Sequence, residues 1–346
     1  MSILSGVSSF FGLDIGNTGI RVVELHGSAG TRSLVKYAYV PVDTQTLLSD
    51  AEADKQKIAQ VLKDLLDQAK LSSSNVAVGL PSNKVFTTVV DFDRLPEADM
   101  GRAISLQADA LIPTPLDESK LDWAITGDAP TDPGKLEVLL TSVTNDYVEK
   151  QLDLLESVGL NVIAFEPDSI ALARALVMPG DMEPQLLLDV GQLTSDIVVV
   201  MGGAPRLVRS VPIGLEAIVK SAQQNLKVDD KQARQFVEKF GVSKEKLEGQ
   251  VYQAIIGTVD QLVLEVDKSI KFFQSRYTDA KLQKIIATGG ASSVPELPLF
   301  IANKFGLQVE IGNAWRNVSY ASSRQNELLA VSNHFGVAAG LAERNE

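Results

Sequence analysis

The chain has 346 residues, of which 45% are hydrophobic and 22% charged; this composition excludes wholesale disorder and collagen-like structure, and the length suits about two domains. With 44 Asp and Glu against 32 Lys and Arg, the net charge of −12 argues against a general nucleic-acid binder, which needs an excess of cations. There is no cysteine and there are two histidines, which excludes disulfides and thiol nucleophiles and disfavours a Ser-His-Asp triad. We expect no site role for His26 or His334.

We expect neither a membrane-spanning segment nor a signal peptide. No apolar run reaches the roughly 18 to 20 residues that span a bilayer. The segment Met1–Leu13 lacks the basic region of a signal peptide, so we expect a leader and a first strand, with a weak membrane-surface anchor as the alternative. The tail Glu343–Glu346 is expected to fray.

The first quarter of the chain predicts a small α/β unit. Two apolar stretches within Phe10–Leu25 flank a Gly-Asn-Thr-Gly turn, which is typical of a β-hairpin. A third strand is expected at Leu34–Val42, a helix at Lys55–Lys70, and a buried strand at Asn75–Leu80 that Pro81 ends.

The segment from Lys84 to Leu160 predicts a compact α/β insert. Its pattern indicates, in order, a strand, a helix, a hairpin and an amphipathic helix, at Val85–Phe92, Leu95–Leu111, Leu121–Thr126 with Leu136–Val143, and Tyr147–Val158.

The second half repeats the pattern of the first. Leu186–Val200 is again two apolar stretches around a glycine-containing turn, so Asp189-Val-Gly corresponds to Asp14-Ile-Gly about 175 residues earlier. The expected elements that follow are a strand, two helices, a short strand and a closing helix, at Ala204–Val211, Asp230–Phe240, Leu247–Arg276, Ile285–Thr288 and Phe335–Ala342. A duplicated α/β chain with facing hairpin turns indicates two lobes and a cleft.

The Asp-x-Gly turns suit phosphate and magnesium binding. Glycine lets backbone N–H groups approach phosphate oxygens, and an aspartate at a strand end can accept hydrogen bonds from water on Mg²⁺. One such turn is usually an ordinary hairpin, but two that face each other can hold one polyphosphate. The turn Thr288–Ser293 suits a nucleoside lying on its glycines, or is an ordinary strand-to-helix turn. No GxxxxGK[ST] sequence is present, which excludes a P-loop, and no GxGxxG follows a strand.

Taken in order, these segments resemble the motifs of the actin-like ATPase superfamily. The phosphate-1, connect-1, phosphate-2, adenosine and connect-2 motifs match Gly12–Leu25, Phe165–Ala175, Leu186–Val200, Ile285–Leu297 and Gly336–Leu341. Within the superfamily the chain is most similar to the PilM family of type IV pilus assembly proteins, through GLDIGNTGIRVVEL, ISLQADALIPTPLDESKLDWAI and LLTSVTNDYVEKQLDLLESVGLNVIAFEPDSIALARAL.

The resemblance implies a two-lobed actin-like ATPase fold, a duplicated ribonuclease H-like fold with an inserted 1C-type subdomain. The expected parts are a first lobe (1A) at 1–83, 161–184 and 331–346, the insert (1C) at 84–160, a second lobe (2A) at 185–216 and 284–330, and a helical subdomain (2B) at 217–283.

The resemblance also implies an ATP and Mg²⁺ site. Asp14 and Asp189 would organise water on Mg²⁺. The phosphates would be held by Gly16, Asn17, Thr18, Arg21, Gly191 and Thr194, and the nucleoside would face Gly289, Gly290 and Ser293.

Four further residues are implied at the site, three of them with an alternative left open. Glu166 has the place where relatives position the attacking water, or is a helix-entry carboxylate. Glu265 and Lys268, three apart on one helix face, resemble a pair that borders adenine and ribose, or form a surface ion pair. Gly214, which stands alone where relatives often have a glycine pair, would offer a backbone amide near the phosphates.

The implied function is an ATP-binding scaffold at the inner face of the cytoplasmic membrane. Its partner would be the N-terminal cytoplasmic tail of PilN, in a groove between 1A and 1C. Other pilus-machine ATPases, platform proteins and homo-oligomers stay open as partners, as does ATP hydrolysis. The alternatives are a filament-forming, FtsA-like division protein, which usually has a C-terminal membrane helix, and a small-molecule kinase, which needs a further catalytic aspartate.

Overall fold

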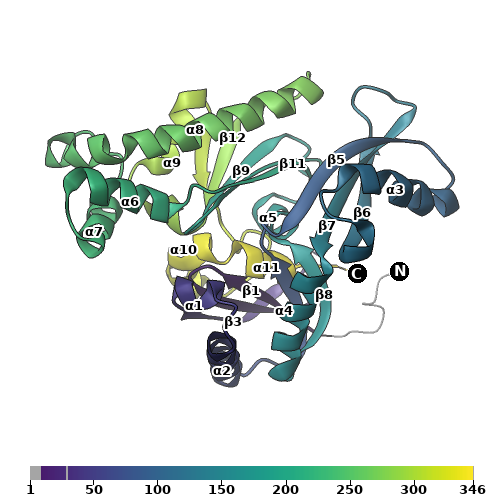
Figure 1. Ribbon diagram of the computed structural model, residues 1–346, viewed down its shortest axis with the longest axis horizontal. Coiled ribbons are helices and arrows are strands. Elements are labelled where there is room, and N and C mark those ends of the chain that lie inside the picture. The colour runs from purple at the N-terminus through teal and green to yellow at the C-terminus, as the bar shows by residue number, and fades with distance from the viewer. Residues whose placement is uncertain (1–8, 29, 346) are drawn as a thin grey trace.

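Two five-stranded sheets of the same strand order form the frame of the molecule (Figure 1). This computed structural model describes residues 9–28 and 30–345; the predicted leader before residue 9 lies outside the described residues. The first sheet has the order β3-β2-β1-β4-β8, with strands β1 (Phe11–Gly16), β2 (Gly19–His26), β3 (Ser33–Pro41), β4 (Asn75–Leu80) and β8 (Asn161–Pro167). The second has the order β11-β10-β9-β12-β13, with strands β9 (Gln185–Val190), β10 (Ser195–Met201), β11 (Ala204–Val211), β12 (Lys284–Thr288) and β13 (Gln308–Ile311).

The pairing within the sheets confirms the duplication. β1 pairs antiparallel with β2 and parallel with β4, and β9 likewise pairs antiparallel with β10 and parallel with β12. Parallel neighbours need a crossover, and helices make these crossovers in both lobes.

Helices cover both sheets. Those that pack with the first sheet are α1 (Thr44–Leu48), α2 (Glu52–Ala69), α4 (Asn145–Ser157), α5 (Asp168–Leu176) and α11 (Gly336–Ala342). The second lobe carries α6 (Leu215–Leu226), α7 (Asp230–Phe240), α8 (Gln250–Arg276), α9 (Leu297–Phe305) and α10 (Gln325–Val331). Short 3₁₀ turns lie at Leu116–Glu118, Lys246–Gly249, Gly290–Ser293, Ser322–Arg324 and Ser332–His334.

Strand β9 shows why these apolar runs become central strands. Leu186 and Leu188 face the core beneath α6 and α8, whereas Leu187 faces the opposite core with α5 and α11. Both faces are therefore buried, and the strand needs apolar residues at successive positions. Side chains alternate along a strand, so Asp189 shares the face of Leu187, between the lobes.

One core joins the two lobes, and it is rich in alanine beside larger side chains such as Leu172 and Trp315. It combines α5 and α11 with residues from both sheets, among them Ala171, Ala175, Ala338 and Leu187. Gly340 lies so close to α5 that a Cβ atom on it would overlap the carbonyl group of Ala171. Small side chains thus let the two helices approach closely.

The insert is a three-stranded sheet with one helix. Its order is β5 (Val85–Asp93), β7 (Lys135–Thr144), β6 (Ser119–Asp128), and α3 (Glu97–Leu111) packs on it through Met100 and Ile104. The predicted boundary at residue 160 was wrong, because Leu155 and Leu160 belong to the core of the first lobe. The insert therefore ends at about Thr144, where β7 leads directly into α4.

The chain end is anchored, contrary to the expected fraying of Glu343–Glu346. Glu343 is 7% exposed, and Arg344 donates to Glu166 at 2.9 Å. Arg32 also donates to the carbonyl oxygen of Ala342 at 3.2 Å. Glu346 lies outside the described residues.

Candidate functional site

A cavity of about 570 Å³ lies between the lobes. This volume is within the range of sites for small molecules and cofactors. The structure brings most of the predicted site residues into its lining, namely Asp14, Gly16, Asn17, Thr18, Arg21, Asp189, Gly191, Thr194, Gly289 and Gly290.

The first hairpin turn pairs an anion with a cation. Asp14 and Arg21 lie opposite each other on β1 and β2, with 3.4 Å between the Arg21 Nη1 and Asp14 Oδ2 atoms. Arg21 also donates to the Thr18 hydroxyl at 3.2 Å. Burial raises the pKa of Asp14, and the neighbouring Arg21 offsets part of that rise. A Cβ atom at Gly16 would lie 3.1 Å from the Arg21 guanidinium, so glycine leaves room for this pair.

The second hairpin turn has the same geometry with the opposite charge balance. Asp189 lies opposite Asp196 on β9 and β10, at the register that Asp14 and Arg21 occupy in the first lobe. Burial, followed by the charges of Asp196 and Asp14, raises the pKa of Asp189 to about 7. The second lobe therefore presents two facing carboxyl groups where the first presents an ion pair.

Other polar residues of the cleft were not predicted from the sequence. Asp168, the first residue of α5, lines the cavity together with Ser82 and Asp196. One side-chain oxygen of each is buried without a hydrogen-bond partner in the structure. Burial and the nearby carboxylates, first among them Asp14, hold the pKa of Asp168 well above its usual range. The cleft is thus strongly acidic.

The glycine-rich turn after β12 is held by Asn333. Gly289 has φ 80°, which favours glycine, and a Cβ atom there would overlap the Asp189 carboxylate. The Asn333 side-chain amide donates to the Gly289 carbonyl at 3.2 Å and to the Ser292 and Ser293 hydroxyls at 3.0 Å. In return, the Asn333 carbonyl accepts from the Gly289 N–H group at 3.0 Å.

Removing this amide is expected to loosen the turn. In the Asn333→Ala variant, buried acceptors lose their donor, so the free energy of unfolding should fall by about 1–3 kcal/mol. Chemical denaturation measures this change. Ser293→Ala, which removes one of the three acceptors, serves as the matched control and should cost less; an Asn333→Ala variant as stable as Ser293→Ala would contradict the role given to the amide.

Comparison with known proteins identifies the family. The model of the family described as "Type IV pilus assembly protein PilM" matches residues 12–346. The chain belongs to the PilM family.

Solved structures give the same fold for this PilM-family chain. A structure described as the PilM-PilN type IV pilus biogenesis complex matches with a TM-score of 0.82 at 23% identity, over 97% of this chain and 98% of that one. The ethanolamine utilization protein EutJ from Carboxydothermus hydrogenoformans matches with a TM-score of 0.56 at 14% identity, over 97% of this chain and 89% of that one. MreB5 of Spiroplasma citri bound to ADP matches with a TM-score of 0.55 at 12% identity, over 96% of this chain and 95% of that one. The fold is that of the actin-like ATPases.

The structure places Glu166 outside the lining of the cleft. It is 3% exposed, and its carboxylate accepts from Arg174 at 3.1 Å and from Arg344 at 2.9 Å. The two guanidinium groups keep it in a structural ion cluster that holds the chain end. Asp168, two residues later, is the carboxylate from this segment that lines the cavity.

Glu265, Lys268, Gly214 and Ser293 also lie outside the cavity lining. Glu265 forms ion pairs with Lys268, at 2.7 Å, and with Arg209 on β11. This arrangement corresponds to the ion pair that the sequence left open as the alternative to a nucleoside contact. A Cβ atom on Gly214 would lie 2.5 Å from the carbonyl oxygen of Gln192, so the absence of a side chain lets Gly214 pack closely against the second hairpin turn.

His334 was expected to have no site role, yet it lines the cavity. Its imidazole would lie 3.6 Å from a Cβ atom at Gly290, beside the glycine-rich turn. Burial, followed by the charge of Arg21, lowers the pKa of His334. A neutral aromatic ring at this wall suits contact with a flat apolar group.

Two negative findings concern the described residues, 9–28 and 30–345. Within them, no helix is long and apolar enough to cross a membrane. Nor do three His, Asp or Glu side chains in these ranges form a group that could hold a metal ion.

Proposed function

We propose that the chain is an ATP-binding scaffold of the type IV pilus machine that binds the cytoplasmic N-terminal tail of PilN. One observation carries the nucleotide part: two sheets of identical strand order direct their Asp14 and Asp189 turns into one cavity. The partner part rests on membership of the PilM family and on the likeness to a structure described as a PilM-PilN complex.

The nucleotide would lie with its phosphates between the two hairpin turns. Gly16, Thr18, Gly191 and Thr194 line the cavity at these turns, and backbone N–H groups of such turns suit phosphate oxygens. The nucleoside would lie against Gly289 and Gly290. The similar MreB5 structure is described as bound to ADP.

The donor set fits a hydrated magnesium ion. Asp14 and Asp189 offer carboxylate oxygens from opposite lobes, while the described residues hold no ready-made group of three metal ligands. Mg²⁺ keeps several waters and binds through few carboxylates together with substrate phosphates. The ion would supply positive charge between the acidic cleft and the polyphosphate, and the two aspartates would orient its waters.

The partner tail would lie between the first lobe and the insert. β6 in the insert and β8 in the first sheet are edge strands among the described residues, and an extended peptide can add to such an edge. The insert also exposes apolar side chains, with Leu106 74% and Ile125 49% exposed. A peptide of alternating apolar residues suits these features, and binding to PilN would bring the chain to the inner face of the cytoplasmic membrane.

Calorimetric titration of the full chain tests the partner. A synthetic PilN-tail peptide should bind saturably at one site, with and without Mg²⁺-ATP. A peptide of scrambled sequence and the same composition is the control. Failure of the PilN peptide to bind under both conditions would refute the partner assignment.

Thermal unfolding tests the nucleotide. A ligand that binds only the folded state at a concentration 1,000 times its Kd stabilises that state by about 4 kcal/mol. Mg²⁺-ATP should therefore raise the melting temperature, and ATP with EDTA should raise it much less. Equal melting temperatures with and without Mg²⁺-ATP would refute the nucleotide site, whatever the peptide does.

A further inference from the structure

A buried carboxylate of the insert is held by three side chains of the second lobe. Glu137, on β7, is 1% exposed. It accepts from Arg206 on β11, from the Tyr277 hydroxyl, and from Arg276 at the end of α8 at 3.0 Å. Thr126, from the neighbouring strand of the insert, also donates to it at 3.0 Å. We call these five residues the Glu137 cluster.

The cluster ties all three strands of the insert to the second lobe. Besides Glu137 on β7, Arg206 donates to the Thr126 carbonyl on β6 at 2.6 Å, and Arg276 pairs with Asp91 on β5. β5 also packs along β11 (Figure 1). The insert is therefore held as one unit against the second sheet.

The charges of the cluster depend on one another. Burial alone would raise the pKa of Glu137, but the Tyr277 hydrogen bond and the Arg206 charge hold it below its ordinary value. Arg206 is itself only 9% exposed. Removing the carboxylate would leave a buried cation without its anion, which is strongly unfavourable. The Glu137 cluster therefore favours an insert that stays packed against the second lobe.

The contact between the insert and the first lobe is of a different kind. The chain crosses between them twice, at 81–84 and at 144–145. A small apolar cluster surrounds these crossings, formed by Leu80, Val85, Val143 and Val148. Among residues 9–28 and 30–345, no ion pair joins the insert to the first lobe. The Asn145 side chain, at the second crossing, donates one hydrogen bond to the carbonyl oxygen of Asp117 in the insert at 2.9 Å. Apolar contacts have no fixed direction, so they permit a change of angle more readily than the Glu137 cluster does.

The first of these crossings also forms part of the cavity wall. Pro81, Ser82 and Asn83 line the cleft, and the Ser82 hydroxyl is buried without a hydrogen-bond partner. A ligand in the cleft can therefore contact the segment about which the insert would turn.

We propose that the insert moves with the second lobe, through the Glu137 cluster, so that a nucleotide in the cleft changes the angle between the insert and the first lobe and with it the affinity for the partner tail. This inference rests on the proposed function and adds its regulation. Glu137 acts here as a positioning residue, remote from both ligands.

Thermodynamic coupling is the first test. Mg²⁺-ATP should change the peptide Kd of the wild-type chain by about 10-fold, within the usual range for coupled sites, and the peptide should change the ATP Kd by the same factor. In Glu137→Gln the factor should fall close to one, while each ligand alone binds within about 3-fold of wild type. Asp93→Asn, which breaks an exposed ion pair with Lys135 inside the insert, is the matched control and should keep the wild-type factor.

An unchanged factor in Glu137→Gln, or a factor of one in the wild type, would overturn the inference while leaving both binding activities in place. Absence of binding in the wild type would instead count against the proposed function.

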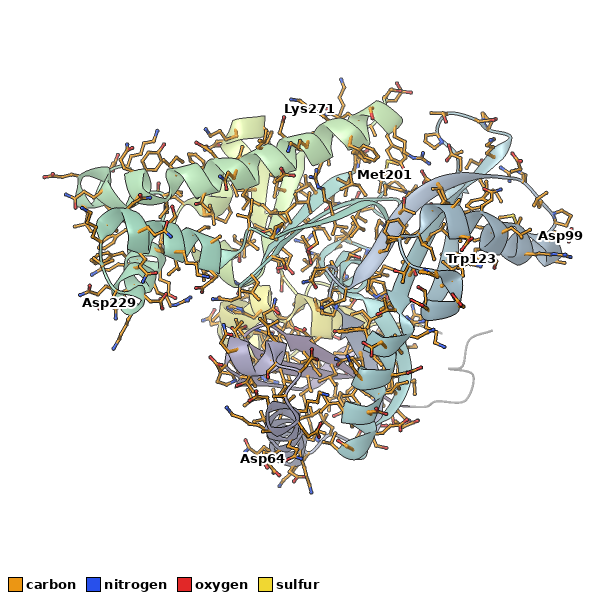
Figure 2. The ribbon with its side chains drawn as sticks, viewed as in Figure 1. Asp64, Asp99, Trp123, Met201, Asp229 and Lys271 are labelled. Atoms are coloured by element: carbon orange, nitrogen blue, oxygen red, sulfur yellow. The ribbon has the colours of Figure 1, made fainter. Side chains whose placement is uncertain are left out.

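Distances between spin labels give a second test that needs no peptide. The chain has no cysteine, so pairs of introduced cysteines are labelled cleanly. Figure 2 shows three suitable exposed sites, Asp64 on α2, Asp99 on α3 and Lys271 on α8. Mg²⁺-ATP should shift the Asp64–Asp99 distance and leave Asp99–Lys271 unchanged. In Glu137→Gln the Asp99–Lys271 distribution should broaden.

The opposite pattern, with Asp64–Asp99 fixed and Asp99–Lys271 shifted, would show that the insert moves with the first lobe and would overturn the inference, as would no shift in either. If Glu137→Gln does not fold, Asp91→Asn takes its place, because it removes only the half-buried outer ion pair with Arg276 and should broaden the same distribution to a smaller extent.

Discussion

Replacing Asp189 by asparagine is expected to raise the melting temperature of the nucleotide-free protein at pH 8. Burial and the facing Asp196 raise the pKa of Asp189 from 3.8 to about 7, so the folded state keeps a proton that the unfolded state has already released. Stability therefore falls as the pH rises from about 4 to about 7. A neutral amide removes this loss, which for a three-unit difference amounts to at most about 4 kcal/mol. At pH 4 the two proteins should unfold at similar temperatures.

The same variant should lose most of its response to Mg²⁺-ATP. An amide carries no charge for the magnesium waters, so we expect nucleotide affinity to fall about 100-fold or more, in line with the loss of a charged hydrogen-bonding partner. Thermal unfolding across pH 4–8, with and without Mg²⁺-ATP, measures both effects. Asp67→Asn removes the same charge from an exposed position on α2 and should change neither. A nucleotide-free Asp189→Asn protein less stable than wild type at pH 8 would contradict the acidic-cleft argument.

Replacing Gly340 by alanine is expected to destabilise the fold by about 3 kcal/mol. The added methyl group would overlap the carbonyl group of Ala171, and backbone atoms cannot move aside as a flexible side chain can. The two helices would have to separate at the core that joins the lobes. Chemical denaturation measures the loss.

The matched control is Gly257→Ala, in the exposed middle of α8. A Cβ atom at Gly257 meets nothing within 4 Å, so alanine should stabilise the helix by about 1 kcal/mol. Equal effects of the two substitutions would show that the α5–α11 contact is looser than the structure has it.

The local pattern of apolar residues and glycines was sufficient to predict the two hairpins. It did not predict the charge of the residue that faces each aspartate on the neighbouring strand. The Asp14 and Asp189 turns follow from apolar stretches around a glycine, which can be seen in the sequence. Asp196 was missed although it is seven residues after Asp189, as Arg21 is after Asp14. The equal seven-residue spacing indicates that Asp196 and Arg21 are equivalent positions. A comparison of residue types did not reveal this, because the two side chains have opposite charge.

Other parts of the site depend on contacts between distant segments. Asn333 reaches the glycine-rich turn from more than 40 residues away in sequence, and Asp168 reaches the cleft from the start of a helix. Hydrophobic periodicity predicts that α4 is a helix, but it cannot say that Leu155 packs with the first lobe and not with the insert. Glu166 was placed by its position in a motif, whereas the guanidinium groups of Arg174 and Arg344 decide where its carboxylate lies.

The small residues between α5 and α11 also set how the lobes can move relative to one another. α11 packs on β1 and β2 of the first sheet, whereas α5 also packs on β10 and β11 of the second, so a small slide at the α5–α11 contact would shift one lobe relative to the other. The insert lies well to one side of these helices, with α3 at its outer end (Figure 1). A rotation too small to disturb the packing near the cleft would therefore displace α3 over a larger distance.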